Sequence, residues 1–202
     1  MKNKYLYSII LLGVILILLI FVYAENLIDF ISDKNYRNKP INKKSFKPIQ
    51  RIEYKVIPLI NDDYFDIVLE EIENAKQSIK IVMYIIQLDD EDIYTLIDTL
   101  IDKKNEGLIV KVILSNADEN INPKLYNANS ETIEYLKNFC VDSEINLKND
   151  ETHDKLILID GKTAIIGAHN WTKQSLKFNN EISILIKSDT EIGDIINYIK
   201  RF

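Results

Sequence analysis

The chain has 202 residues, a formal net charge of −6, one cysteine and two histidines. One cysteine excludes an internal disulfide framework and a cysteine-rich zinc site, and two histidines exclude a His-rich metal cluster. The length fits one domain with a small extra element, and 47% hydrophobic residues with few glycines and prolines exclude a disordered or fibrous chain.

Charge is spread unevenly along the chain. Residues 1–33 sum to −1, residues 34–55 carry eight Lys or Arg against one Glu, or +7, and the remaining residues therefore carry −12. A basic segment is thus followed by an acidic domain, which is not typical of a general nucleic-acid binder.

Residues 5–24 contain no charged side chain. A helix of that length spans roughly 30 Å, the thickness of a bilayer core. We therefore predict an N-terminal transmembrane helix that anchors the protein in a membrane over residues 1–24, with a signal peptide cleaved after Ala24 as the alternative. Lysines before the run and acids after it favour a cytoplasmic N-terminus and a domain outside the cytoplasm, whereas the basic cluster further on opposes that orientation.

We predict a basic linker over residues 25–50, because this segment is rich in Asn and Lys and contains two prolines. This linker either lies against anionic lipid head groups or is a solvated spacer. Over residues 51–202, strand patterns alternate with helix patterns, which predicts an α/β domain with a mixed, largely parallel sheet and helices on both faces.

In chain order, the pattern predicts a strand at 52–60, a helix at 64–78, a strand at 79–86, a helix at 91–105, a strand at 108–114, a helix at 131–140, strands at 155–159, 163–166 and 181–186, and a helix at 191–202. Asp89 or Asp90 caps the second helix and Gly107 ends it, so the acidic run there is interpreted as a helix start rather than a cation site. Asp160-Gly161 is a strong hairpin-turn signal, which adds an antiparallel pair. Cys140 is expected to be a buried and inert thiol.

The residues that carry chemistry flank this hairpin. His153 and Lys155 are two positions apart, so in a strand they point to the same face. An imidazole beside an ammonium suits a phosphate, because the lysine neutralises oxygens while the histidine attacks or transfers protons. The second hairpin strand ends at Gly167, where backbone can approach a ligand closely, and Asn170 offers an amide at a predicted helix start, which favours anions. We expect these groups to converge on one anion.

Five residues around the hairpin share the order and spacing of a known signature, His153-x-Lys155-x4-Asp160-x6-Gly167-x-x-Asn170. This pattern resembles the His-Lys-Asp motif of the phospholipase D superfamily, and the surrounding elements resemble its catalytic domain over roughly residues 51–202. The family usually has a serine after the glycine, where this chain has Ala168. Because that serine is expected to help hold phosphate, the departure predicts weaker phosphate binding.

The resemblance implies a mechanism that needs two such motifs facing each other. This chain has one copy and no internal repeat, so it resembles the small single-motif members, the bacterial endonuclease type and the type called Zucchini. Those members build one active site across a twofold dimer interface. The resemblance therefore implies a homodimer that brings His153 and Lys155 of each subunit into one pocket, with no metal and no other cofactor.

The resemblance also implies residue roles. His153 is the nucleophile that forms a phosphohistidine in one subunit and the general acid and base in the other. Lys155, Asn170 and Gly167 hold the phosphate, and Glu181 hydrogen-bonds a catalytic histidine and fixes its tautomer.

Two motif-region residues have weaker assignments. Asp160 belongs to the catalytic signature by resemblance, but its position at a turn indicates a structural role. His169 falls at a variable motif position and is expected to be structural or to line the pocket.

Three classes of function compete on this evidence. The first is a phospholipase D-type phosphodiesterase acting on phospholipid, the second a metal-independent endonuclease acting on DNA or RNA, and the third a membrane-tethered, non-catalytic binding protein with a degraded site. The acidic domain and the predicted anchor slightly favour phospholipid, since a tether raises local concentration near the bilayer. The basic segment 34–55 would instead guide a polyanion, and the intact motif disfavours the third class.

Overall fold

The computed structural model describes residues 53–147 and 151–202. The anchor predicted over residues 1–24 and the linker predicted over residues 25–50 lie outside these ranges. No helix within the described ranges is long and apolar enough to cross a membrane.

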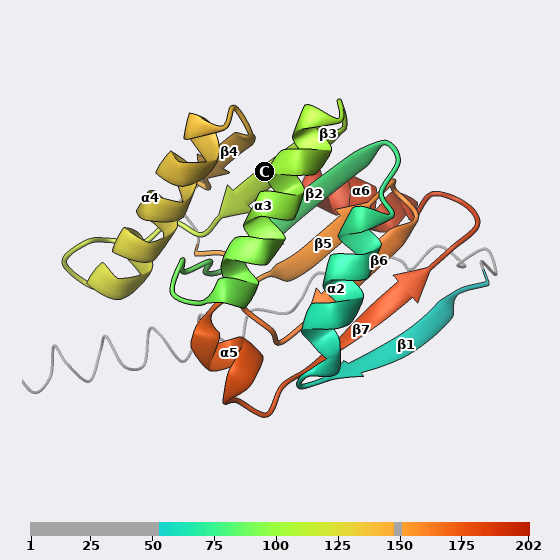
Figure 1. Ribbon diagram of the computed structural model, residues 1–202, viewed down its shortest axis with the longest axis horizontal. Coiled ribbons are helices and arrows are strands. Elements are labelled where there is room, and N and C mark those ends of the chain that lie inside the picture. The colour runs from blue at the N-terminus through green and yellow to red at the C-terminus, as the bar shows by residue number, and fades with distance from the viewer. Residues whose placement is uncertain (1–52, 148–150) are drawn as a thin grey trace, which may run out of the picture. The chain divides into compact units, whose positions relative to one another are not determined.

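The described residues form one mixed sheet with the strand order β1-β7-β6-β5-β2-β3-β4 (Figure 1). The strands are β1 (Lys55–Ile60), β2 (Ser78–Met83), β3 (Ile109–Leu114), β4 (Asp142–Ile145), β5 (Lys155–Ile159), β6 (Thr163–Gly167) and β7 (Ile182–Lys187). The helices are α2 (Asp63–Glu73), α3 (Glu91–Asn105), α4 (Pro123–Asn138), α5 (Lys173–Lys177) and α6 (Gly193–Ile199).

The mixed α/β fold is confirmed, but the expectation of a largely parallel sheet is wrong. Only β2 with β3 and β3 with β4 pair in parallel, and the other neighbours pair antiparallel. The reason lies in the hairpin. Asp160 and Gly161 both adopt positive φ, 52° and 69°, which forms a tight turn and sets β6 antiparallel to β5 at the centre of the sheet.

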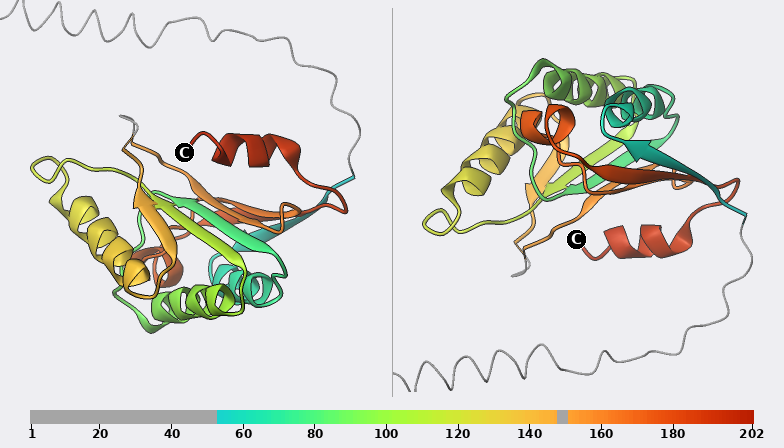
Figure 2. Two further views of the ribbon diagram at one scale, coloured as in Figure 1. Left: turned by 90° about the horizontal axis from the view of Figure 1, so that it is seen from above. Right: turned by 90° about the horizontal axis from the view of Figure 1, so that it is seen from below.

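Helices cover both faces, as predicted, with α2 to α5 on one side of the sheet and α6 alone on the other (Figure 2). The larger core lies under α2 and α3, where Val68 and Leu96 pack with Ile81 of β2. The smaller core lies under α6, where Ile199 packs with Leu156 of β5. Helices therefore cover the two faces of the sheet unequally.

Several elements differ from prediction. Helix α2 ends at Glu73 rather than at Ser78, and β4 was not predicted. Helix α4 begins at Pro123 rather than Glu131, because Asn122 caps it by accepting the Leu125 N–H and proline suits the first helical position. The helix ends at Asn138, so Cys140 lies beyond it, exposed and with a φ of 58°. The prediction of a buried thiol is wrong.

The strand directions bring several loops to a single edge of the sheet. Strands β1, β2, β3 and β6 end there, and β5 and β7 begin there, as their pairings require. We call this the catalytic edge because it carries four residues with predicted roles in catalysis or phosphate binding, His153, Lys155, Asn170 and Glu181. The hairpin turn lies at the opposite edge.

Candidate active site

His153 stands at the catalytic edge just before β5, and 68% of its side chain is exposed. Its ring stacks on Tyr84, which follows β2, with the ring centroids 4.4 Å apart and the planes 13° from parallel. The Nε2 atom lies 3.7 Å from Oε2 of Glu151. The imidazole is thus held flat on an aromatic ring and stays open to solvent, as an attacking group requires.

Tyr84 is itself fixed by buried polar contacts. Its N–H donates to the Asp154 carbonyl at 2.7 Å. The buried Asn129 of α4 donates through Nδ2 to the carbonyls of Tyr84 and Ser115, at 2.9 and 3.0 Å, and accepts the Ile86 N–H at 3.2 Å. One amide therefore ties together the ends of β2 and β3 beneath the site. Sequence reasoning missed this role, and the available signal was a polar residue on the apolar face of a helix.

Lys155 begins β5 and is half-buried beside the histidine. Its Nζ donates to the His153 carbonyl at 2.8 Å and lies 5.1 Å from the centroid of the Tyr84 ring. Burial lowers the pKa of Lys155, and the carboxylates of Glu181 and Asp154 oppose that shift. The structure therefore brings the predicted imidazole and ammonium together on one tyrosine ring.

Glu181 and Asn170 are joined through the hydroxyl of Ser175. This hydroxyl donates to Oε2 of Glu181 at 2.7 Å and accepts the Asn170 N–H at 2.8 Å. The other oxygen of Glu181 accepts from Nδ2 of Asn179 at 2.7 Å. Within the described part of one chain, no hydrogen bond links Glu181 to His153. Ser175 was missed by sequence reasoning, although it lies in the helix whose start was predicted near Asn170 and which Thr172 caps.

The side-chain oxygen of Asn170, Oδ1, is unusual because it is a buried acceptor without a donor among the described residues. Ala168, at the position where the family usually has serine, is exposed, and its N–H donates to the Ile182 carbonyl at 3.1 Å. The methyl group adds no donor at this edge.

Gly167 is required by packing between two strands. A Cβ at this position would lie 2.3 Å from both Cα and Oγ of Ser183 on β7. The Ser183 hydroxyl in turn pairs with Nδ1 of His169 at 2.7 Å, and the buried His169 ring stacks on Tyr64 with centroids 4.2 Å apart. Packing against β7 therefore explains why glycine occupies this position, whether or not a ligand binds there.

Replacing Gly167 with alanine is expected to lower the free energy of unfolding of the full chain by about 1–3 kcal/mol, because the new methyl group overlaps the β7 backbone. Chemical denaturation followed by circular dichroism measures the change. Gly193→Ala is the matched control, since nothing lies within 4 Å of a Cβ there. Equal unfolding midpoints for the two variants would contradict this packing role.

Asp160 lies at the opposite edge. Its carboxylate accepts the N–H groups of Lys76, Gln77 and Ser78 at 2.9, 2.7 and 2.9 Å. The length of β5, about 16 Å for five residues, separates it from His153. This placement favours the structural role over a direct catalytic one.

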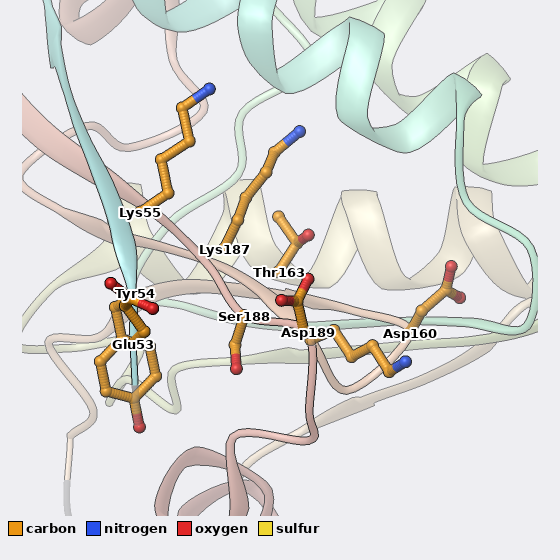
Figure 3. A pocket seen from close by; sticks show the side chains of 9 residues that line it. Glu53, Tyr54, Lys55, Asp160, Thr163, Lys187, Ser188 and Asp189 are labelled. Carbon is orange, nitrogen blue, oxygen red and sulfur yellow. The ribbon is translucent and has the colours of Figure 1, made fainter. Parts of the chain in front are cut away.

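A separate open pocket also lies at this opposite edge (Figure 3). Its lining includes Lys55, Asp160, Lys187 and Asp189, but none of the side chains at the catalytic edge. Lys187 is ion-paired with Glu71 at 2.5 Å.

The acidic run at the start of α3 serves as a helix cap and ion-pair partner. Asp90 caps α3 and pairs with Lys177 at 2.5 Å. Across the described ranges, no group of three or more His, Cys, Asp or Glu side chains is placed to hold a metal ion.

Comparison with known proteins gives a family match. Residues 68–202 match the family described as "Cardiolipin synthase, PLD-like domain". A cardiolipin synthase of Oceanobacillus iheyensis is 34% identical over 123 residues, which are 58% of this chain and 25% of that protein. The chain thus spans about a quarter of the length of this relative.

Solved structures share the fold. Nuc from Salmonella typhimurium, a phospholipase D family member, aligns with a TM-score of 0.62 and 20% identity over 74% of this chain and 93% of its own. NucT from Helicobacter pylori gives 0.56 and 23% over 74% and 95%. The phosphatidylserine synthase of Haemophilus influenzae gives 0.59 and 13% over 73% and 38%.

Proposed function

Because this chain belongs to the family of cardiolipin synthase, phospholipase D-like domains, we propose that it is a phosphodiesterase that works through a phosphohistidine on His153. The observation that carries the proposal is the exposed imidazole of His153 and the ammonium of Lys155 side by side on the Tyr84 ring. Nucleophile and phosphate-neutralising cation then share one rigid support.

The proposed reaction has two displacement steps at phosphorus. In the first, a ring nitrogen of His153 forms a bond to phosphorus, and the bond from phosphorus to the leaving alcohol breaks. A second imidazole gives its proton to the leaving oxygen. In the second step that imidazole takes a proton from water, the water oxygen bonds to phosphorus, and the N–P bond breaks. The Lys155 ammonium stabilises the charge on the phosphate oxygens in both steps.

The second imidazole is proposed to come from another copy of the chain. The sequence has two histidines, and His169 is buried against Tyr64 and Ser183, where it cannot reach substrate. His153 of a twofold-related copy supplies the missing group if the two catalytic edges face each other. One chain is then half of an active site.

The remaining predicted residues take supporting roles in this proposal. The side-chain amide of Asn170 holds phosphate together with Lys155. Glu181, fixed in its own chain by Ser175 and Asn179, hydrogen-bonds a catalytic histidine in the assembled dimer. We also propose that the backbone at Gly167 contacts the phosphate.

Phospholipid is the proposed substrate. Residues 56–202 carry −12, which disfavours a polyanionic nucleic acid, and the anchor proposed over residues 1–24 would hold the site near a bilayer. The charge of +7 over residues 34–55 favours the second candidate, a metal-independent endonuclease.

The substrate proposal is tested by giving the full chain phospholipid vesicles, single-stranded DNA and RNA in separate assays with EDTA present. We expect release of phospholipid head groups, no loss of activity in EDTA, and no release by His153→Ala. Cleavage of nucleic acid without lipid turnover would replace the substrate proposal with the endonuclease. Turnover of no substrate would favour a non-catalytic binding protein.

A further inference from the structure

Asp154 lies between His153 and Lys155 in the chain, directly before β5. Leu156, two residues further on, is buried in the core under α6. Because side chains alternate between the two faces of an extended chain, Asp154 also faces α6, whereas Lys155 faces the other side of the sheet. The middle position of the motif therefore reaches a face of the sheet that the Lys155 side chain does not reach.

Two hydroxyl groups donate to the same oxygen of the Asp154 carboxylate. Tyr198 of α6 donates to Oδ2 at 2.8 Å, and the buried Thr152 donates to the same atom. Burial and the hydrogen bond to this carboxylate raise the pKa of Tyr198, so its hydroxyl remains protonated and able to donate at neutral pH. One carboxylate oxygen thus joins the C-terminal helix to the segment that precedes β5.

The position of Tyr198 is fixed by the packing of its helix, which lies alone on its side of the sheet (Figure 2). At the start of α6, the Ile192 N–H donates to the Gly161 carbonyl at 2.8 Å, at the edge that carries the hairpin turn. Ile192 and Ile199 are buried in the smaller core. The helix therefore runs from the turn edge toward the catalytic edge, and its last turn brings Tyr198 to Asp154.

His153 depends on such contacts because it stands outside the paired part of β5. The pairing of β5 with β2 ends at Lys155, so the strand ladder positions Lys155 but not His153. The residue between them is held by two further contacts. The Tyr84 N–H donates to the Asp154 carbonyl at 2.7 Å, and the Tyr198 hydroxyl donates to the Asp154 carboxylate. Loss of the contact with α6 is therefore expected to shift His153 and to leave Lys155 in place.

We propose that Asp154 and Tyr198 are positioning residues, and that the Tyr198 hydroxyl, through the Asp154 carboxylate, fixes the backbone that carries the His153 imidazole. This inference rests on the proposed function, because the positioned group is the nucleophile of that reaction. An attacking atom must lie in line with the bond that breaks, and a misplacement of about 1 Å can cost about a hundredfold in rate. The C-terminal helix then belongs to the catalytic apparatus, although it covers the face of the sheet opposite to the Lys155 side chain.

Turnover by variants of the full chain tests the positioning. Tyr198→Phe removes the hydroxyl and keeps the ring, and we expect kcat to fall about tenfold or more while KM changes by less than about twofold, because Lys155 stays in place. Asp154→Ala should show the same split, and the double variant should be no slower than Asp154→Ala alone. Asp154→Asn should restore most of the turnover that Asp154→Ala loses, because its amide oxygen still accepts from Tyr198. Tyr54→Phe is the matched control, since Tyr54 is 39% exposed and lines the pocket at the opposite edge.

The NMR spectrum of the histidine rings gives a readout that needs no turnover. The His153 ring stacks on Tyr84 with centroids 4.4 Å apart, so the ring current of Tyr84 moves the carbon-bound protons of His153 upfield. The other histidine of the chain is buried, which distinguishes its signals from those of the exposed His153. In the full chain with labelled histidine, Tyr198→Phe should reduce the upfield shift of His153, and Tyr54→Phe should leave it unchanged.

Three results would overturn the positioning role. They are a kcat for Tyr198→Phe equal to that of Tyr54→Phe, an Asp154→Asn protein as slow as Asp154→Ala, and a His153 resonance that Tyr198→Phe leaves unchanged. A wild-type chain that turns over no phosphodiester would instead remove the proposed function. In that case the resonance of His153 would still show whether Tyr198 holds the imidazole in place.

Discussion

Substitution of His153 by asparagine is expected to lower phosphodiesterase turnover by about a thousandfold or more. In the proposed dimer one substitution removes both the nucleophile and the proton donor, because each copy supplies one of them. Asparagine keeps a planar polar group above the Tyr84 ring, so the fold is expected to survive. Turnover at saturating substrate measures the effect, with circular dichroism to confirm folding.

Glu151→Gln is the matched control for this substitution. It removes the carboxylate 3.7 Å from His153 Nε2 without touching the imidazole. Both groups are exposed, so we expect turnover within a few-fold of wild type. If the His153→Asn protein keeps more than about a tenth of wild-type turnover, His153 does not take part in the chemistry.

Substitution of Lys155 by methionine is expected to lower kcat/KM by about a hundredfold or more, since the charge that stabilises the phosphate oxygens is lost. Methionine keeps much of the length and the apolar contact with Tyr84. Lys80→Met is the control, because this lysine lies on β2 toward the opposite edge. Similar losses in the two variants would show that the effect is not specific to the site.

The same lysine predicts the alkaline limb of the pH profile. Burial lowers the pKa of Lys155 below the usual 10.5 of a lysine, so its charge is lost at a lower pH than that of an exposed lysine. KM is expected to rise as the pH passes through this lowered pKa. The nearby Glu181 carboxylate opposes the shift. Glu181→Gln should therefore move the alkaline limb to lower pH, and a limb that stays in place would contradict this coupling.

Features set by local sequence were predictable. The hairpin followed from Asp160-Gly161, and α3 began and ended as predicted because Asp90 caps it and Gly107 follows it. The start of α4 was not predictable from apolar spacing, because Asn129 and Thr132 occupy buried positions on its inner face. They are there to bind loop backbone, which only the folded structure makes evident.

Strand orientation was the main failure of sequence reasoning. The apolar runs that became β2 and β3 are parallel, as expected, but the direction of β7 and β1 depends on where the hairpin enters the sheet. Strand β4 was not predicted because three of its four residues are polar. Pairing partners distant in sequence decide both features.

For the site, the motif identified His153 and Lys155 but not the groups that hold them in place. Tyr84 follows strand β2, Asn129 comes from α4, and Ser175 comes from a short helix after the motif. The contacts of Tyr84 and Asn129 cross long stretches of chain, whereas Ser175 lies five residues from Asn170 and six from Glu181. Spacing along the sequence carries no information about such contacts.

The most direct test of a shared active site uses mixed dimers. Wild-type and His153→Asn chains with different affinity tags are co-expressed, and dimers that carry both tags are isolated by two successive affinity steps. If each site needs His153 from both copies, mixed dimers are as inactive as His153→Asn homodimers. Mixed dimers with about half of the wild-type activity would show that each chain holds a complete site, and would contradict the proposal.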